Sequence, residues 1–199
     1  MIFRRFRALA PAAIAVAAMF SVAQGAWAQE SARVKFATTA GDFVVEVYPD
    51  KTPKTVENFL QYVKDKHYDG TIFHRVIENF MVQGGGFDTQ YSQKKTRAPV
   101  VHEGREALAK GGLRNVVGTL AMARTNDPQS ATAQFFINVK DNAFLDPSAQ
   151  SFGYTVFGKV VSGMEVIEKI KTTPTGAGGP FPSDVPKTPI LINSATLVK

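Results

Sequence analysis

Short segments rich in β-branched and aromatic residues recur along most of this sequence, while a helical spacing of apolar residues occurs in only two places. A hairpin signal at residues 38–41 joins the first two strand-like segments. About eight strands and two short helices in one domain predict a mostly β fold, either a closed antiparallel barrel or a sandwich. The predicted strands are residues 34–37, 42–47, 71–77, 80–83, 117–122, 135–139, 154–161 and 190–198.

The two helical segments begin with recognisable start signals. The first, residues 52–63, opens with Thr52 as the expected cap and Pro53 at the first helical position, where no backbone N–H is needed. The second is expected to open at a capping box, Ser162-Gly163-Met164-Glu165, and to run to about Ile170. In the first helix four apolar residues follow the spacing i, i+3, i+4 and i+7 and predict a face that packs on the core: Val56, Phe59, Leu60 and Val63.

Two long stretches lack periodicity. Residues 88–115 are polar and irregular, and a loop of this length usually carries function or disorder. Residues 172–189 are rich in Gly and Pro and are expected to form a surface loop before the last strand closes the sheet. Gly84-Gly85-Gly86 follows a strand but opens no helix, so it indicates a turn or a close backbone approach rather than a phosphate loop.

Residues 1–28 differ in kind from the rest and predict a cleavable signal peptide. Basic residues at Arg4, Arg5 and Arg7 precede an apolar stretch from Ala8 to Ala23, which is shorter than the about 20 residues that span a bilayer. An A-x-A site at 26–28 places the expected cut after Ala28.

The mature domain is then expected to be residues 29–199, and its location periplasmic or secreted. An uncleaved anchor and a mitochondrial presequence are the alternatives, and the unbroken apolar run argues against the second because presequences are amphipathic. The export route, general or twin-arginine, stays open. After cleavage we expect no stable association with membranes.

Charge and composition exclude several kinds of function. Of the 23 Lys and Arg residues three lie in the signal segment, which holds none of the 17 Asp and Glu residues, so the mature chain is only weakly basic. We therefore expect no nucleic-acid partner. The densest basic cluster, Lys94, Lys95 and Arg97, is interpreted as a solvated loop rather than a phosphate-binding patch. The absence of Cys excludes disulfides, thiol nucleophiles and thiolate metal sites.

Familiar catalytic machinery is also missing. His67, His74 and His102 show no metal-ligand spacing, and neither an HExxH nor a G-x-S-x-G motif occurs. His74 lies inside an apolar strand and is interpreted as a hydrogen-bonded core residue rather than a base. We expect neither a metal nor another cofactor.

Two segments instead set isolated polar side chains among aromatic and thioether groups. Residues 73–85 place Arg75 and Gln83 in an otherwise apolar strand pair, and residues 133–138 place Gln134 before Phe135-Phe136. Taken separately, each is simply a β-strand core with an outward polar residue. Together they indicate an apolar pocket with one cation and two amides, which suits an apolar, uncharged substrate.

At these two segments the sequence closely resembles the cyclophilin family of peptidyl-prolyl isomerases, in particular its bacterial periplasmic branch. The likeness covers nearly all of residues 34–198, in order and without a second domain. FHR followed by FMxQGG, with QFFI further along, is a specific combination. The matching segments are Asn58-Phe59, FHRVIENFMVQGG (73–85), GGLRNVVGTLAMA (111–123), SATAQFFIN (130–138), NAFLD (142–146) and FGYTVFGKVVSGMEVIEKI (152–170).

The resemblance implies a closed eight-stranded antiparallel barrel, capped by a helix at each end, with a substrate groove on the outside of the sheet. It implies Arg75 as the catalytic arginine and Gln83 as the residue that orients this arginine and contacts the peptide. It implies that the groove also contains the following residues: Phe80, Met81, Phe136 and Leu145 as walls of a proline pocket, Ala123 and Gln134 beside the substrate backbone, and Phe144 and Tyr154.

Three positions depart from the common eukaryotic pattern. Phe144 stands where that pattern has a tryptophan, Tyr154 where it has a histidine, and Arg124 where it has an asparagine. Because Phe144 has no indole N–H, we expect only weak binding of the cyclic inhibitor cyclosporin.

The resemblance finally implies proline-containing polypeptides as clients, no cofactor, and isomerisation of X–Pro bonds in exported or folding proteins by a chain that we expect to be a monomer. The alternative is a non-catalytic, chaperone-like binder of proline-containing segments. Members of that kind usually lose the arginine or the pocket phenylalanines, whereas Arg75, Phe80 and Phe136 are all present.

Overall fold

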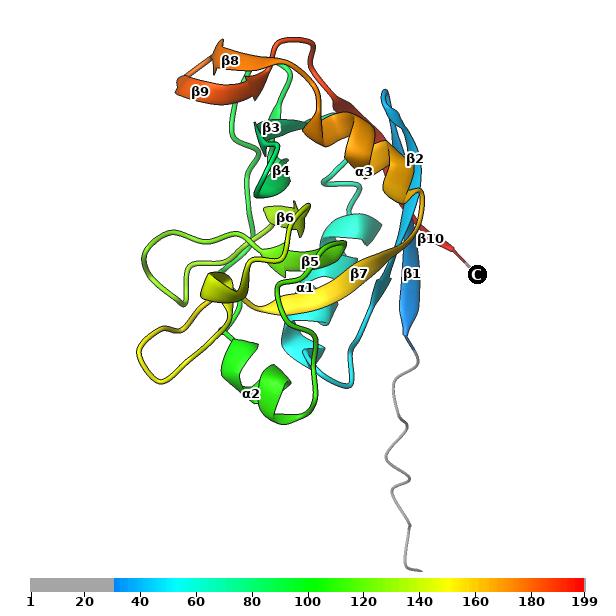
Figure 1. Cartoon of the computed structure of the whole chain (residues 1–199). Helices are drawn as coiled ribbons and strands as arrows, with labels where there is room; N and C mark the ends of the chain where they lie inside the picture. Colours follow the sequence, from blue (N-terminus) through cyan, green and yellow to red (C-terminus); the bar gives the residue numbers. More distant parts are fainter. Residues whose placement is uncertain (1–30, 199) are drawn as a thin grey trace, which may run out of the picture.

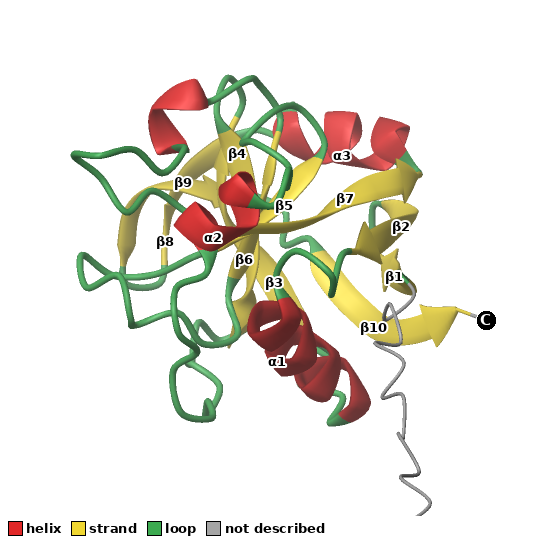
Figure 2. Cartoon of the chain, turned by 90° about the horizontal axis from the view of Figure 1, so that it is seen from below, coloured by secondary structure: helices red, strands yellow, loops and turns green. Residues whose placement is uncertain are grey.

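The computed structural model describes residues 31–198, and the predicted signal peptide lies outside this range. Eight strands close into a barrel in the order β1-β10-β3-β4-β6-β5-β7-β2, and every neighbouring pair is antiparallel (Figures 1 and 2). The barrel, not the sandwich, is the fold. Its strands are β1 (Ala32–Thr38), β2 (Gly41–Val47), β3 (Thr71–Ile77), β4 (Met81–Asp88), β5 (Thr119–Met122), β6 (Phe135–Asn138), β7 (Val156–Ser162) and β10 (Leu191–Val198).

The barrel interior is filled by aromatic side chains that alternate with outward residues along each strand. Phe36 of β1 and Phe43 of β2 stack with their ring centres 5.0 Å apart. Phe135 of β6 lies 5.4 Å from Phe36, and Phe73 of β3 lies 6.2 Å from Phe135. All four are at most 1% exposed, so the interior is a packed core and a binding site has to lie outside it.

A helix covers each opening of the barrel, as predicted. The ring of Phe59 on α1 (Pro53–Lys64) lies 5.1 to 6.4 Å from rings on β1, β6 and β7, which belong to different sides of the barrel. The helix α3 (Met164–Lys171) contacts β2, β3 and β4, which again lie on different sides. Among the described residues no helix is long and apolar enough to cross a membrane.

Both helices begin where the sequence predicted but with different caps. Pro53 does occupy the first turn of α1, yet the Thr52 hydroxyl donates to the Tyr48 carbonyl and caps nothing. The capping box of α3 does not form, because Gly163 is the cap residue, with φ +81° and no side-chain hydrogen bond. A Cβ at Gly163 would lie 2.5 Å from the Asp42 carbonyl oxygen, so this turn needs glycine for space as well as for φ.

Two segments expected to be irregular contain regular structure. Within residues 88–115, α2 (Gly104–Ala109) forms a short helix, and within residues 172–189, β8 (Thr175–Gly178) and β9 (Phe181–Pro186) form a two-stranded hairpin. The hairpin packs on β3, as its place beside that strand in Figure 1 shows. Each of these elements is too short for a periodic pattern and owes its form to tertiary contacts.

Candidate active site

A row of four side chains crosses the outer face of four adjacent strands. Arg75 of β3 pairs with Gln83 of β4, Gln83 pairs with Phe136 of β6, and Phe136 pairs with Ala121 of β5. Residues that pair across an antiparallel sheet point to the same face. On each of the four strands at least one neighbour of these residues is buried in the barrel core, so this row stands on the outside of the barrel; these neighbours are Val76, Val82, Leu120, Met122, Phe135 and Ile137.

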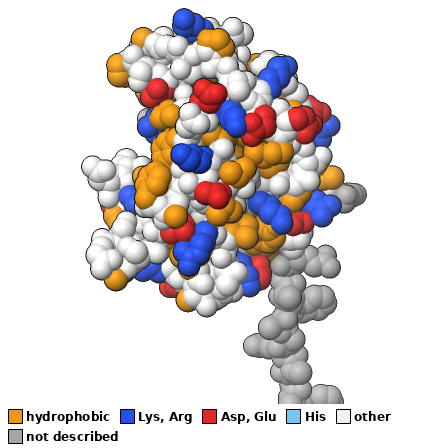
Figure 3. Space-filling view, viewed as in Figure 1, with side chains coloured by type: hydrophobic (Ala, Val, Ile, Leu, Met, Phe, Trp, Pro, Cys, Tyr) orange, Lys and Arg blue, Asp and Glu red, His pale blue; other side chains and the backbone are white. Residues whose placement is uncertain are grey.

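Apolar side chains surround this row and form a cluster separate from the barrel core. Figure 3 shows hydrophobic side chains gathered over the region of β4, β5 and β6, with Lys and Arg side chains among them. An external apolar groove is what the resemblance implied. The buried members of the cluster are Met81, Ala121, Phe136, Leu145 and Val156.

The outer face is hollowed at this cluster by a cleft of about 330 Å³, which we call the Arg75 cleft. Nine of the ten site residues expected from the sequence line it, and Gln134 is the exception. The complete lining is Arg75, Phe80, Met81, Gln83, Ala123, Arg124, Phe136, Phe144, Leu145 and Tyr154.

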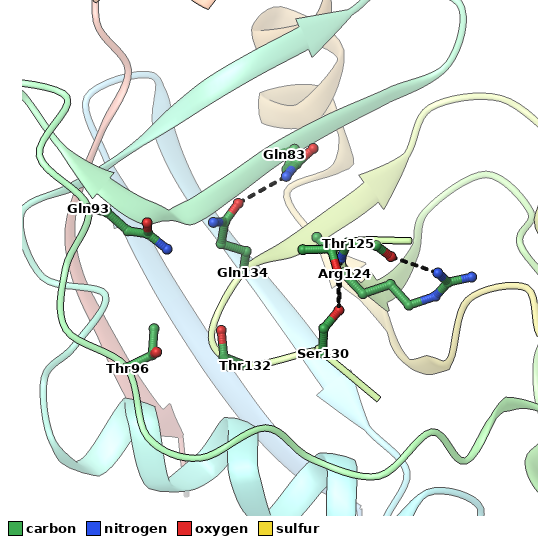
Figure 4. A pocket seen from close by; sticks show the side chains of 9 residues that line it. Gln83, Gln93, Thr96, Arg124, Thr125, Ser130, Thr132 and Gln134 are labelled. Carbon is green, nitrogen blue, oxygen red and sulfur yellow. Dashed lines mark hydrogen bonds between the residues drawn. The ribbon is translucent and has the colours of Figure 1, made fainter. Parts of the chain in front are cut away.

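Gln134 lies in a second hollow of about 280 Å³, the Gln134 hollow, which shares Gln83, Ala123 and Arg124 with the Arg75 cleft. The side-chain amide of Gln83 donates to the Gln134 carbonyl oxygen at 3.0 Å (Figure 4). At Gly86 a Cβ would lie 2.5 Å from the Gln134 side chain, which confirms that this Gly-rich run serves close approach. The other lining residues are Gln93, Thr96, Thr125, Ser130 and Thr132.

Arg75 projects from β3 into water at the edge of the cleft. Its side chain is exposed, and it makes no ion pair within residues 31–198. Gln83 was expected to orient it, but the Gln83 amide is bonded to Gln134 instead. The guanidinium therefore keeps its donors available for a bound molecule.

The far wall of the cleft is the short helix η1 (Ala143–Leu145). Its Phe144 is 73% exposed and stacks on Phe80 with ring centres 5.7 Å apart. The backbone N–H of Tyr154 donates to the Leu145 carbonyl at 2.9 Å, which ties η1 to the segment before β7. An exposed and a half-buried phenylalanine held in a stack form a wall suited to an apolar ring.

A buried polar network, absent from the sequence prediction, fixes this wall. The Asn142 amide donates to the Phe80 carbonyl at 2.9 Å and to the Asn138 side chain at 2.8 Å. Asp146 accepts from the backbone and side chain of Asn115 at 2.8 and 3.0 Å. The four side chains of the network are at most 7% exposed and are connected by hydrogen bonds: Asn115, Asn138, Asn142 and Asp146. Asn and Asp beside a strand end were the available signal, but their partners depend on the folded register.

Arg124 is a second cation of the site, and the sequence assigned it no role. Its guanidinium carbon lies 4.5 Å from the centre of the Tyr154 ring, within reach of a cation–π contact. Its Nε and Nη2 donate to the Gly153 carbonyl at 3.1 and 2.8 Å. No Asp or Glu lines the Arg75 cleft or the Gln134 hollow, so both carry net positive charge.

The histidines lie outside these hollows. His74 is 3% exposed, as predicted for a core residue, but its Nδ1 has no hydrogen-bond partner among residues 31–198. Burial lowers the pKa of His74 to about 4. Within the described residues no group of three or more His, Asp or Glu side chains has an arrangement that would hold a metal ion.

Comparison with known proteins gives one consistent family. Residues 33–197 match the family described as "Cyclophilin type peptidyl-prolyl cis-trans isomerase/CLD". The chain is 53% identical over 168 residues to "Peptidyl-prolyl cis-trans isomerase cyp18" of Streptomyces antibioticus, covering 83% of this chain and 98% of that protein. It is 52% identical over 167 residues to "Peptidyl-prolyl cis-trans isomerase B" of Escherichia coli, covering 82% and 98%.

The fold is also found in a solved structure. A cyclophilin type isomerase of Cryptosporidium parvum matches with a TM-score of 0.65 and 23% identity, covering 85% of this chain and 99% of that one. This likeness concerns the fold, and it agrees with the closed eight-stranded barrel and its helices.

Proposed function

Since this chain belongs to the family of cyclophilin-type peptidyl-prolyl cis–trans isomerases and is such an enzyme, we propose that the Arg75 cleft is where it turns X–Pro bonds, and that its clients are exported polypeptides. One observation carries the assignment of the site. A guanidinium that forms no ion pair in the described part of the chain stands in register beside an apolar floor on the outer face of the sheet. A structure of the Cryptosporidium parvum relative was determined in the presence of the dipeptide Ala-Pro.

Rotation of a prolyl peptide bond is favoured by an apolar site that holds one hydrogen-bond donor. Rotation about the peptide bond has a barrier of about 18–20 kcal/mol because amide resonance has to be broken. Halfway through the rotation the proline nitrogen regains its lone pair and the carbonyl dipole shrinks. An apolar floor favours this less polar state over the planar amide, and Arg75 can donate to the nitrogen lone pair, which the ground state lacks. Such contacts bind the transition state more tightly than the substrate.

Typical free energies show how much of the lower barrier one hydrogen bond from Arg75 can provide. A millionfold acceleration requires a barrier lower by about 8 kcal/mol. One charge-assisted hydrogen bond contributes about 1.5–3 kcal/mol. The remainder has to come from the apolar wall of Phe80, Phe136 and Phe144 and from holding the twisted chain. This division requires no proton transfer and no covalent intermediate.

A protease-coupled tetrapeptide assay on the chain starting at Gln29 tests the proposal. We expect turnover in the unaltered protein and a loss of about 10- to 150-fold in kcat/KM for Arg75→Ala from the lost bond alone. Arg75→Lys should rescue poorly, because an ammonium lacks the planar fork of donors. Arg105→Ala is the matched control, since Arg105 lines neither the Arg75 cleft nor the Gln134 hollow. Near-normal turnover in a folded Arg75→Ala protein would refute the role of Arg75.

Export rests on residues 1–28 alone. The basic start, the apolar run and the A-x-A site support a periplasmic or secreted isomerase that accelerates slow prolyl steps in proteins folding outside the cytoplasm. Mass spectrometry of the intact protein recovered from a bacterial host should give a chain that begins at Gln29. Recovery of the full 199 residues only inside the cell would contradict export.

A further inference from the structure

Three hollows follow one another on the surface of this enzyme. The Arg75 cleft shares Gln83, Ala123 and Arg124 with the Gln134 hollow. The Gln134 hollow reaches Thr96, which Figure 4 shows on the chain segment opposite Thr132 and Gln134. Thr96 also lines a third hollow of about 400 Å³, which we call the Lys95 hollow. A polypeptide that occupies the Arg75 cleft can therefore continue over the surface into the Lys95 hollow.

The Lys95 hollow is strongly cationic. Lys66, Lys94, Lys95 and Arg97 line it, and Asp65 is the only carboxylate among its lining residues. Asp65 is already engaged, since Arg97 Nε donates to it at 2.9 Å and Gln61 donates to it at 2.9 Å. Lys66 and Lys95 are exposed and make no ion pair within residues 31–198.

Hydrogen bonds hold the segment that carries these cations in a fixed place. Lys94 Nζ donates to the carbonyl oxygens of His67 and Asp69 at 2.6 and 3.0 Å. Its backbone N–H donates to the Gly86 carbonyl at 2.9 Å, and the Arg97 N–H donates to the Tyr62 hydroxyl at 2.8 Å. Lys95 and Arg97 are exposed, as expected for the solvated loop that the sequence indicated, but the backbone of this segment is held against β4 and α1.

We infer that the Lys95 hollow is a docking subsite for carboxylate side chains of the same polypeptide whose proline occupies the Arg75 cleft. The inference rests on the proposed function and adds a substrate class, acidic segments near proline. Four cations and a single, already paired carboxylate leave positive charge uncompensated at the Lys95 hollow, and this hollow adjoins the Gln134 hollow at Thr96, which in turn adjoins the Arg75 cleft. Attraction at exposed sites acts over about 10 Å at 0.1 M salt, so it should strengthen binding without altering the chemical step.

Paired peptides test the inference. Each carries one Ala-Pro bond and a block of about four Asp residues, about two residues away from the proline, on either the N-terminal or the C-terminal side. Since an extended chain advances about 3.3–3.6 Å per residue, such a block passes over the neighbouring hollows. Peptides with Asn in place of Asp are the neutral partners. With the block on one of the two sides of the proline, we expect KM to be about three- to tenfold lower for the Asp peptide than for the Asn peptide at low salt, with equal kcat. The difference in KM should shrink at about 0.5 M salt.

The double variant Lys66→Gln/Lys95→Gln should abolish this advantage and leave turnover of the Asn peptides unchanged. Lys187→Gln, which removes an exposed lysine that lines none of the three hollows, should retain it. Equal KM for Asp and Asn peptides would overturn the inference while the proposed function stands. An advantage that survives the double variant would show that the two exposed lysines of the Lys95 hollow do not carry it, and it would equally overturn the inference. Absence of turnover on the Asn peptides would overturn the proposed function and this inference together.

Discussion

The polar groups of the Arg75 cleft are few, and each is held differently. Arg75 projects from a strand and makes no ion pair with any described residue, whereas Arg124 is fixed by the Gly153 carbonyl and the Tyr154 ring. Gln83 is bonded to Gln134. A substrate can therefore move Arg75 at little cost, but it meets Arg124 and the amide pair already in place. We interpret Arg75 as the group that follows the rotating bond and the others as fixed walls.

Phe144 provides a residue-scale prediction for the inhibitor cyclosporin. The ring is 73% exposed and stacks on Phe80, so a larger ring at this position needs no rearrangement of the core. Phe144→Trp adds an indole N–H at the rim, and one net hydrogen bond is worth about 0.5–1.5 kcal/mol. We expect cyclosporin to bind the variant about 2- to 13-fold more tightly, measured by calorimetric titration.

Turnover of the same variant is the control, and it should change less than cyclosporin binding, because Phe144 contributes an apolar wall that the indole retains. Nanomolar binding of cyclosporin by the unaltered enzyme would contradict the weak binding that we expect.

At this scale the sequence identified the lining of the site but not its internal contacts. Nine expected residues share one cleft because the motif segments 73–85 and 133–138 become neighbouring strands, and the segment after β5, the helix η1 and the segment before β7 pack beside them. The bond between Gln83 and Gln134 and the ring contact of Arg124 depend on register and on loop path, which residue types do not encode. The hydrogen bonds of Asn142 to Phe80 and Asn138 could not be predicted from the sequence for the same reason.

At the scale of elements, α1 receives its cap from a distant residue. Glu103, the residue before α2, is 5% exposed and accepts from the backbone N–H groups of Lys54 and Thr55 at 3.2 and 2.7 Å. It also accepts from the Thr55 hydroxyl at 2.7 Å. A carboxylate at a helix N-terminus satisfies free donors and meets the positive end of the helix dipole. Thr52 was the expected cap because local sequence offers only local candidates.

Glu103→Ala should lower the free energy of unfolding by about 1–3 kcal/mol, because three donors, two of them on buried Thr55, lose their acceptor. Urea denaturation followed by tyrosine fluorescence measures the change. Glu106→Ala in the first turn of α2 is the control, since Glu106 is exposed and its side chain accepts no hydrogen bond from α1 within residues 31–198, and it should cost less than about 0.5 kcal/mol. Equal effects of the two substitutions would show that Glu103 does not stabilise α1.

Elements with a run of β-branched and aromatic residues or a helical spacing of apolar residues were predictable, and elements without such a pattern were not. The strand β3 spans the predicted residues, β2 begins one residue earlier, and β1 was expected at 34–37 but spans Ala32–Thr38. In contrast, α2 has six residues, and β8 and β9 lie in a Gly- and Pro-rich stretch whose pairing is fixed by side chains elsewhere. One such side chain is Phe87 of β4, whose ring lies 5.1 Å from that of Phe181 on β9.

At the scale of the whole molecule, the titratable side chain of His74 lies where the β8–β9 hairpin packs against the barrel. The His74 ring lies 4.7 Å from the ring of Phe87 and 5.4 Å from that of Phe181, so an imidazole is enclosed between β3, β4 and β9. Because unfolding of a single domain is cooperative, protonation of this one side chain bears on the stability of the entire chain.

Stability should therefore fall as the solution is acidified from pH 7 to pH 4. The pKa of His74 is lowered from 6.5 to about 4 by burial, so the unfolded chain binds a proton that the folded chain refuses between these values. The full difference is about 3 kcal/mol, present above pH 6.5 and lost as the pH falls toward 4. Burial also lowers the pKa values of His67 and His102, which adds to the same trend.

Urea denaturation at pH 7.5, 6, 5 and 4.5 measures how the free energy of unfolding changes with pH in the enzyme and in His74→Phe. At pH 7.5 His74 is neutral in the folded and in the unfolded chain, so the difference between the two proteins at this pH gives the packing effect of the substitution alone. As the pH falls, His74→Phe should lose clearly less stability than the unaltered enzyme. An identical slope in the two proteins would mean that His74 is charged, or accessible to protons, within the folded barrel.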